Sequence, residues 1–378
     1  MIAGVSCLLF PLLIVCISGN QFDPHLFPKT GPFFEGWYMR ITDFDRRDSL
    51  GILFGHVLPK QGINTSEPLV MASILRRENC QKGVCQLVSY NAVFTPAQTK
   101  VTVNGKPVIS NPDDASSANF QFEMNSGSEG GLFTQNANLT TFDFRIGNLS
   151  LRGELGPSVP WAPNGGGPEG WLSHLPLPLH WFVYSLRSPL KIYDLTDVGR
   201  KQTMVGHHGV AHLEKNWGLS FPKAWIWAEG VSDYNKNISF ALSGGLVQFS
   251  VISLSAYLIG YRNPFENIDI NFRPDNSVVV LQKDDCKREV NISAKSLFYT
   301  LEINLFSTNS SFSSCLFGPQ ETGFRKACVE SYDAIAKIEV YKASVLGVFV
   351  HKLIDKQTLT DIALEFGGTY VCGNMCMT

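Results

Sequence analysis

A short segment of the chain combines large aromatic rings with polar side chains at close spacing. Residues 214–227 read EKNWGLSFPKAWIW and contain Trp217, Trp225 and Trp227 beside a glutamate, an asparagine and two lysines. Aromatic rings supply apolar area and a few polar atoms fix orientation, which is what a cavity for a large apolar ligand requires. The alternative is a buried strand followed by an amphipathic loop. The segment by itself favours neither interpretation.

Other chemistries find little support in the sequence. His208, His212 and Glu214 would share one face of a strand, but no aspartate or cysteine completes a known metal-ligand pattern, so we expect no metal. The glycine run 165–167 lacks the Gly-Lys-Ser/Thr ending of a phosphate-binding loop. No Gly-x-Ser-x-Gly sequence is present, so a serine hydrolase is not indicated either.

Strands must position these residues. Short runs of β-branched and aromatic residues bounded by Gly, Pro, Asn and Asp recur along the chain, which is typical of an antiparallel β protein. Asn104-Gly105 lies between two apolar runs and predicts a hairpin. The apolar run 246–259 is also expected to form strands, because it is rich in β-branched residues and contains Gln248 and serines. Helical periodicity is weak, and residues 330–336 are the only modest candidate for a helix.

Each half of the chain carries enough predicted strands for a barrel of about eight strands, a size that can hold one small ligand. We therefore predict an all-β fold with two antiparallel β-barrel domains in tandem, over residues 20–195 and 196–378. Residues 156–178 are rich in Pro and Gly and contain Trp161 and Trp171. This segment predicts a long functional loop near the middle of the molecule.

The beginning of the chain and its glycosylation motifs predict export. Residues 2–17 are apolar and uncharged, and small residues follow, so residues 1–19 are predicted to be a signal peptide. An uncleaved anchor stays open, because no Lys or Arg precedes the run. Asn-X-Ser/Thr motifs begin at Asn64, Asn138, Asn148, Asn237, Asn291 and Asn309. Together with a signal sequence, they predict a secreted glycoprotein.

The cysteines and the charge fit the same compartment. The chain has 9 cysteines, of which Cys7 and Cys16 lie in the predicted signal. In an oxidising compartment we expect some of the other seven to pair and one to be left over. Neighbouring candidates, which the sequence does not decide, are Cys80 with Cys85, Cys315 with Cys328 and Cys372 with Cys376. The net charge of −2 gives no reason to expect nucleic acid or an anionic membrane surface as partner.

Four motifs, in this order, resemble tocopherol cyclases. They are GPFFEGWY at 31–38, PLHW at 178–181, EKNWG at 214–218 with FP at 221–222 and WIW at 225–227, and EFGG at 365–368. The resemblance covers nearly the whole chain after the predicted signal. The first and third motifs are specific, whereas the last alone would be weak.

The resemblance implies both a fold and a chemistry. The fold would be two lipocalin-like β-barrels, shared with carotenoid hydratases of the hydroxyneurosporene synthase type. The chemistry would be acid-initiated ring closure, in which a proton adds to a trisubstituted double bond and a phenol oxygen captures the cation to form a chromanol ring. The partner would be an apolar small molecule, a prenylated phenol or another isoprenoid. Neither a redox cofactor nor a metal is needed.

Glutamates beside aromatic residues are the candidate proton donors for such a reaction. Protonating an alkene requires a carboxylic acid whose pKa is raised by burial, and the resulting cation needs π faces and shelter from water. Glu35 and Glu214 are our first candidates and Glu229 the third, although each could instead pair with a basic residue. His180 could bind or protonate the phenolic head group, or be a satisfied core histidine. The candidate substrate-binding residues, with core packing as the alternative, are Trp37, Tyr38, Tyr184, Asn216, Trp217, Trp227 and Glu229.

Two features depart from the family pattern. Pro178 and Leu179 stand where family members commonly carry a glutamate just before the histidine. The predicted export also differs from the plastid or bacterial setting of the familiar enzymes. Two hypotheses follow, a secreted cyclase-like isomerase (intramolecular lyase) and a secreted lipid- or isoprenoid-binding protein without catalysis. The departures favour the second and the intact motifs favour the first, to which we lean.

Overall fold

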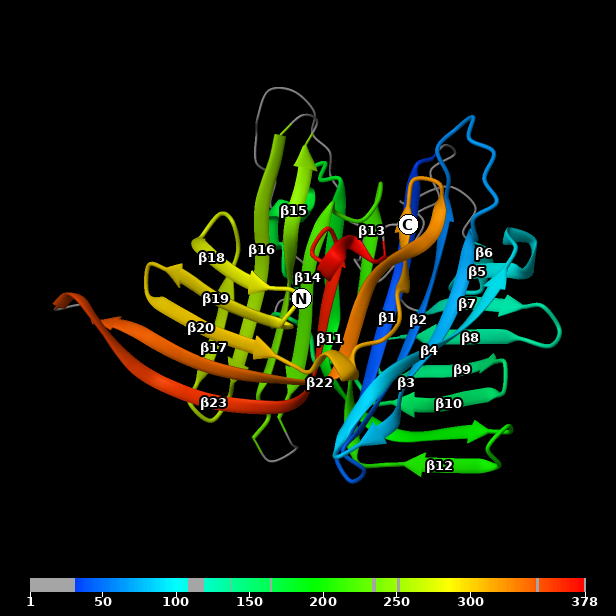
Figure 1. Cartoon of the computed structure of the whole chain (residues 1–378), viewed down its shortest axis with the longest axis horizontal. Helices are drawn as coiled ribbons and strands as arrows, with labels where there is room; N and C mark the ends of the chain where they lie inside the picture. The colour runs from blue at the N-terminus through cyan, green and yellow to red at the C-terminus, as the bar shows by residue number, and fades with distance from the viewer. Residues whose placement is uncertain are drawn as a thin grey trace.

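Two antiparallel sheets contain almost all of the regular structure of the chain (Figure 1). The structure is a computed structural model that describes residues 31–107, 119–136, 138–163, 165–232, 236–249, 252–344 and 347–376. The predicted signal peptide, residues 1–19, lies outside the described residues. Within the described part, the only other elements are short 3₁₀ helices, and no helix is long and apolar enough to cross a membrane. The predicted all-β fold class is confirmed.

The first sheet has the strand order β4-β3-β2-β1-β13-β11-β10-β9-β8-β7-β5-β6, with β12 paired to β11. The strands are β1 (Phe33–Asp43), β2 (Asp48–Leu58), β3 (Val70–Gln81), β4 (Val84–Phe94), β5 (Thr99–Val103), β6 (Lys106–Pro107), β7 (Phe120–Asn125), β8 (Gly130–Gln135), β9 (Thr140–Ile146), β10 (Leu149–Leu155), β11 (Leu179–Asp197), β12 (Gln202–Gly206) and β13 (Gly209–Gly218). The predicted hairpin at Asn104-Gly105 is confirmed, because β5 and β6 pair across it.

The second sheet has the order β17-β16-β15-β14-β23-β22-β20-β19-β18, with β21 paired to β22. The strands are β14 (Ala224–Val231), β15 (Ser239–Phe249), β16 (Ile252–Asn263), β17 (Ile268–Phe272), β18 (Ser277–Asp284), β19 (Glu289–Ser296), β20 (Tyr299–Phe306), β21 (Leu316–Gln320), β22 (Gly323–Ser344) and β23 (Gly347–Gly368). The short helices are η1 (Pro96–Gln98), η3 (Gly170–His174), η4 (Asn309–Ser311) and η5 (Cys372–Asn374).

The pairing of the strands changes from the first sheet to the second between Gly218 and Ala224. Strand β13 lies between β1 and β11 in the first sheet, although its residues follow the boundary that we placed at residue 195. The division into two domains at that residue stays a prediction.

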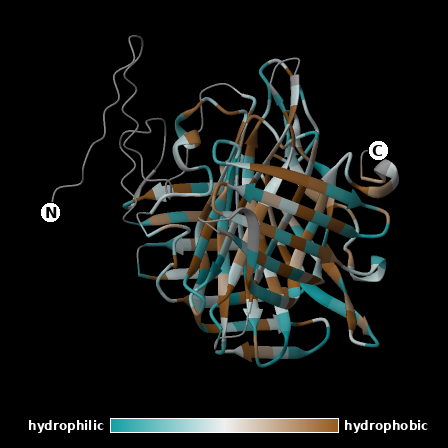
Figure 2. Ribbon diagram, turned by 90° about the vertical axis from the view of Figure 1, so that its left-hand side faces the viewer, coloured by the Kyte–Doolittle hydropathy of each residue, from teal (hydrophilic) through white to brown (hydrophobic). Residues whose placement is uncertain are grey.

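The interior of each sheet is filled by side chains. Alternate residues of β1, such as Trp37 and Met39, join phenylalanines of β7 to β9 in the first core, and isoleucines and leucines form about half of the second. Figure 2 shows this alternation of hydrophobic and hydrophilic residues along the strands. A third cluster joins the outer faces of the two sheets, with Tyr38 and Leu75 against Trp227 and Tyr332. The space inside each barrel-like sheet, where we expected room for a ligand, is therefore packed.

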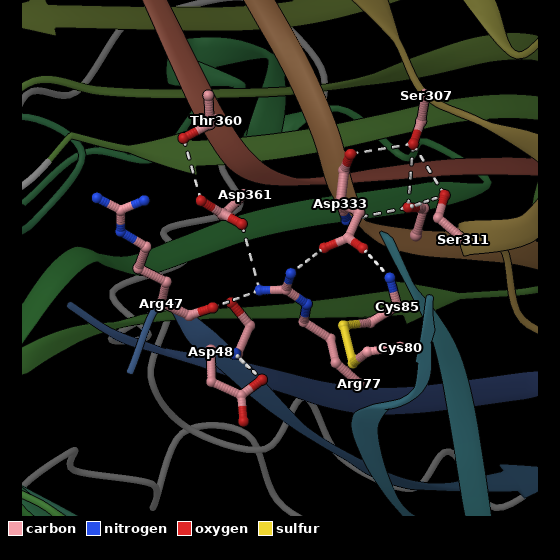
Figure 3. Close-up of polar contacts among 12 residues, drawn as sticks. Arg47, Asp48, Arg77, Cys80, Cys85, Ser307, Ser311, Asp333, Thr360 and Asp361 are labelled. Carbon is pink, nitrogen blue, oxygen red and sulfur yellow. Dashed lines mark hydrogen bonds and ion pairs between the residues drawn. A yellow bond between two sulfur atoms is a disulfide. The ribbon is translucent and has the colours of Figure 1, made fainter. Parts of the chain in front are cut away.

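An ionic contact ties the two sheets together beside this third cluster (Figure 3). The guanidinium of Arg77 on β3 forms ion pairs with Asp333 of β22 and with Asp361 of β23. Asp333 also accepts a hydrogen bond from the backbone N–H of Cys85, at 2.5 Å. These contacts connect β3 and β4 of the first sheet to β22 and β23 of the second.

The segment 330–336 is a strand, so our helix prediction was wrong. It belongs to β22 and pairs with β20 and β23. Ala334 and Ala336 favour a helix by propensity, but both are fully buried in the second core. Tertiary pairing thus overrides a weak local preference.

Among the described residues there are three disulfides, Cys80–Cys85, Cys286–Cys372 and Cys315–Cys376, and Cys328 is a buried free thiol. The expected single unpaired cysteine and the first pairing are confirmed. The pairs Cys315–Cys328 and Cys372–Cys376 were wrong. The tail around η5 returns to the second sheet, which brings Cys376 to Cys315 and Cys372 to Cys286. Neighbours in sequence are therefore not the neighbours in space.

Candidate active site between the two sheets

A cavity of about 470 Å³ lies between the outer faces of the two sheets. Strands β1, β2, β3, β11 and β13 of the first sheet line the cavity, and so do β14, β15, β16, β21, β22 and β23 of the second. Its walls are largely apolar, and they include Leu53, Met71, Phe221, Trp225 and Leu316. A volume of this size fits a small organic ligand.

The registers of the strands explain which residues reach the cavity. In the first sheet, Tyr38 is the direct neighbour of Leu53 on β2 and of Glu214 on β13. In the second sheet, one row crosses four strands and consists of Glu330, Glu365, Trp227 and Ser243. Residues that are direct neighbours in an antiparallel pair point to the same face. The two rows therefore face each other across the cavity.

Glycines widen the cavity at several positions on its walls. Gly36, Gly55, Gly244 and Gly245 line it, and Gly36 is the direct neighbour of Gly55. A Cβ atom at Gly36 would meet only the carbonyl oxygen of Phe54, at 3.7 Å. The absence of a side chain at Gly36 thus leaves open space rather than relieving a clash.

The Pro- and Gly-rich segment before β11 closes one side of the cavity. Glu169, Leu172 and Leu177 from this segment line the cavity. Within η3, Trp171 donates a hydrogen bond from Nε1 to Asp275 of the second sheet, at 2.8 Å. The segment therefore spans from one sheet to the other. Its functional role stays a prediction.

Glu214 lies at the polar end of the cavity with two hydrogen-bond partners on one oxygen. Its Oε2 accepts from Trp227 Nε1 at 3.0 Å and contacts His212 Nε2 at 3.0 Å. Burial lowers the pKa of His212, but the bond with Glu214 and the charge of Glu229 outweigh it and raise that pKa. A protonated His212 donates its Nε2 proton to the carboxylate.

Glu330 and Glu365, which sequence reasoning did not propose as acids, also line the cavity. Tyr38 donates from its hydroxyl to Glu330 Oε1 at 2.9 Å, and Trp225 Nε1 donates to Glu365. Burial raises the pKa of Glu330 well above its usual range, and the charge of Glu365 raises it further. Burial also raises the pKa of Glu365, to about 7, against the lowering effect of hydrogen bonds from Trp225 and Cys328. Both groups therefore hold a proton far more readily than an exposed glutamate.

Glu35 lies on the opposite face of β1, inside the first core. Its Oε1 forms an ion pair with Lys215 Nζ at 2.5 Å, and both side chains have no solvent exposure. Lys215 also lies over the rings of Trp37 and Trp217, at 5.5 and 5.0 Å. Burial lowers the pKa of the neighbouring His56 to about 4. Glu35 and Glu214 consequently do not share a cavity.

Glu229 is held by a second buried ion pair. Arg40 NH1 contacts Glu229 Oε1 at 2.5 Å, with side-chain exposures of 0 and 1 %. Arg40 also donates to Ser49 Oγ at 3.0 Å and lies over the ring of Tyr332. The pair joins β1 to β14 and so couples the two sheets below the cavity.

His180 and Tyr184 point into the first core. The ring of His180 stacks on Trp217 with centroids 5.0 Å apart, and its Nδ1 contacts Glu169 Oε2 at 2.8 Å. Tyr184 accepts a hydrogen bond from Trp37 Nε1 at 2.9 Å. Glu169 thus supplies a carboxylate to this histidine, although Pro178 and Leu179 replace the glutamate that commonly precedes it.

The structure divides the predicted site residues into two groups. The cavity is lined by Tyr38, Glu214, Asn216 and Trp227. Outside the cavity lining are the buried residues Glu35, Trp37, Tyr184, Trp217 and Glu229, and the partly exposed His180. In a strand, Cys328, Glu330 and Tyr332 point to the same face. A strand prediction for this segment would therefore have indicated Glu330 as a candidate acid. In the described part of the chain no group of three or more His, Cys, Asp or Glu is arranged to hold a metal.

Comparisons with known proteins find a matching family and similar solved structures. The profile of the family described as tocopherol cyclase-like matches residues 31–368. The crystal structure of CghA with Sch210972 is similar over 93 % of this chain and 97 % of its own, with 11 % identity and a TM-score of 0.57. A putative AttH from Nitrosomonas europaea shows 14 % identity, 97 and 98 % coverage and a TM-score of 0.47. None of the curated proteins matches the chain by sequence.

Proposed function

Because the chain belongs to the tocopherol cyclase-like family, we propose that it is an intramolecular cyclase that closes a ring on a prenylated phenol or another isoprenoid. The proposed site is the cavity between the two sheets. The observation that carries the proposal is the composition of that cavity, in which tryptophans and leucines surround buried carboxyl groups. An apolar ligand with one polar end fits such a lining.

The cavity residues can support each stage of an acid-initiated ring closure. A protonated carboxyl group transfers its proton to the less substituted carbon of the double bond, which leaves a cation on the other carbon. The faces of Tyr38 and Trp227 and the carboxylate of Glu214 lie on the same cavity and stabilise positive charge. The phenol oxygen then forms the ring bond and releases its proton, so the substrate is isomerised without a net change in composition.

A second candidate function is the binding of an apolar ligand without catalysis. It is favoured because two of the predicted acids are held in buried ion pairs. Glu35 is paired with Lys215 and Glu229 with Arg40, and all four side chains are buried. Neither carboxyl group reaches the cavity lining. If the remaining carboxyl groups donate no proton, the same cavity serves only to hold a ligand.

Secretion is part of the proposal. Three disulfides are compatible with an oxidising compartment. All six asparagines that begin glycosylation motifs are exposed, namely Asn64, Asn138, Asn148, Asn237, Asn291 and Asn309. Glycans can be accommodated at such positions. Peptide-N-glycosidase treatment of the exported protein should lower its apparent mass, and an unchanged mass would contradict glycosylation.

Incubation of the purified protein with prenylated hydroquinones tests the two candidates. A cyclase yields a product of unchanged mass and altered chromatographic retention, and in D₂O the product carries one deuterium on carbon. A binding protein returns the ligand unchanged after tight binding. Absence of both binding and conversion for every prenylated phenol tested would contradict both candidates.

A further inference from the structure

Glu330 and Glu365 form a pair of carboxyl groups on the cavity wall. They are direct neighbours across β22 and β23, so their Cβ atoms are separated by roughly 4.5–5.5 Å. Both line the cavity. Glu330 is 2 % exposed, whereas Glu365 is partly exposed. Two carboxyl groups this close in a buried site cannot both ionise without strong repulsion.

Charged and hydrogen-bonding groups around the pair come from both sheets. They are Tyr38 and Arg40 of β1, Glu214 of β13, Trp225 and Glu229 of β14, and Cys328 and Tyr332 of β22. The cations nearby are Arg40 and, when protonated, His212, and each already pairs with another carboxylate, Glu229 and Glu214 respectively. The surroundings therefore contain little positive charge to stabilise two carboxylates.

Hydrogen bonds distinguish the two members of the pair. Glu330 accepts from the Tyr38 hydroxyl, which also contacts the Tyr332 hydroxyl at 2.9 Å. Glu365 accepts from Trp225 and is the direct neighbour of Trp227, whose ring lies on the cavity wall. Glu330 is thus enclosed by two tyrosines, and Glu365 is the member placed beside the aromatic wall.

We propose that Glu330 and Glu365 share one proton through neutral pH and that Glu365 delivers this proton to the substrate. The proposal rests on the proposed cyclase function and names its acid. The O–H bond of Glu365 breaks as a C–H bond forms on the substrate alkene. The phenol oxygen bonds to the resulting cation, and its proton returns to the Glu365 carboxylate. Each turnover therefore restores the acid, and no co-reactant is consumed. Glu330 is a positioning residue that keeps the shared proton available.

The other glutamates are less suited to this step. Glu169 lines the cavity, but its two oxygens are bonded to His180 and to the backbone N–H of Trp181. Glu35 and Glu229 are ion-paired outside the cavity lining. Glu214 lines the cavity, but its Oε2 is already bonded to Trp227 and His212. Glu214 is the direct neighbour of Tyr38 in the β1–β13 pair, on the same face of the sheet. It is therefore placed to stabilise the cation rather than to donate the first proton.

The test compares Glu365→Gln, Glu330→Gln and the control Glu339→Gln. Glu339 lies on the same strand β22 but pairs with Lys356 away from the cavity. We expect Glu365→Gln to bind the prenylated hydroquinone normally and to lose at least about 100-fold in turnover, as removal of a general acid does. Glu330→Gln should keep turnover at low pH and lose it at a lower pH than the wild type, because a neutral amide no longer repels the ionised form of Glu365. Glu339→Gln should match the wild type in binding, turnover and pH profile.

Two outcomes overturn the proposal while leaving the cyclase function intact. One is a Glu365→Gln variant that binds and turns over like the wild type. The other is a pH profile that Glu330→Gln leaves unchanged. Infrared absorption reports the shared proton independently of turnover, so it distinguishes a failure of this proposal from a failure of the cyclase function. A protonated carboxyl band should persist at pH 8 in the wild type and weaken in either Gln variant. If the wild type shows this band but cyclises no substrate, the result supports the shared proton and contradicts its delivery to a substrate. Absence of the band contradicts the shared proton directly.

Discussion

The buried ion pair between Glu35 and Lys215 allows a quantitative test of the claim that Glu35 is a structural residue and not the proton donor. Its two side chains have no solvent exposure, and Lys215 Nζ approaches Glu35 Oε1 to 2.5 Å. Replacing one partner leaves the other charge buried without compensation, which typically costs about 3–5 kcal/mol. Replacing both by neutral groups of similar shape is often nearly neutral. We therefore expect strong non-additivity between Lys215→Met and Glu35→Gln.

Urea unfolding of the wild type, the two single variants and the double variant measures this coupling. Each single variant should lose about 3–5 kcal/mol of unfolding free energy, which is a large part of an ordinary domain's stability. The double variant should recover most of that loss. Since Glu35 lies on the opposite face of β1 from the cavity, the double variant should also retain ring closure. Additive losses would refute a charge-coupled pair. A folded double variant that binds substrate but does not convert it would show that Glu35 or Lys215 takes part in catalysis.

Three further predictions concern Gly36 on the cavity wall, the titration of Glu365 and the Cys286–Cys372 disulfide. Gly36→Leu should fill part of the cavity and weaken ligand binding at least about tenfold. It should cost little stability, because a Cβ atom at this position meets only one atom, at 3.7 Å. Titration of the tryptophan fluorescence with ligand measures the affinity, and an undiminished affinity would place the ligand elsewhere. The folded-state pKa of Glu365, about 7, exceeds an unfolded value of roughly 4.3, so the folded state binds the extra proton and loses stability as pH rises between these values. Glu365→Gln should therefore show a smaller fall in unfolding free energy over that range than the wild type, and parallel curves would contradict the shift. Loss of the Cys286–Cys372 bridge in the double variant Cys286→Ser, Cys372→Ser should cost about 2–5 kcal/mol in thermal unfolding, and an unchanged melting temperature would show that the bridge contributes nothing.

The sequence predicted the fold more completely than the site. Alternating patterns and the Asn104-Gly105 turn were sufficient to predict strands and a hairpin, because these signals are local. In β1, however, both faces are buried, since Trp37 enters the first core and Tyr38 the space between the sheets. A period of two residues cannot say which buried face carries a ligand. That is why Glu35 and Glu214 seemed equivalent as acids.

The features that sequence reasoning missed depend on long-range register. Glu330 and Glu365 meet only because β22 and β23 pair over long strands whose register shifts several times. No local pattern specifies that alignment. The same holds for Cys315 and Cys376, which are joined by the return of the tail. The motif EFGG contains Glu365, but its pairing with Glu330 depends on the neighbouring strand β22.

The structure of the protein with a bound prenylated hydroquinone, determined crystallographically, tests the central claim most directly. We predict that the ligand occupies the cavity between the two sheets, with its isoprenoid double bond beside Glu365 and Trp227 and its ring within reach of Glu214 or Tyr38. A ligand bound inside either barrel-like sheet, or against Glu35 and His180, would contradict the account.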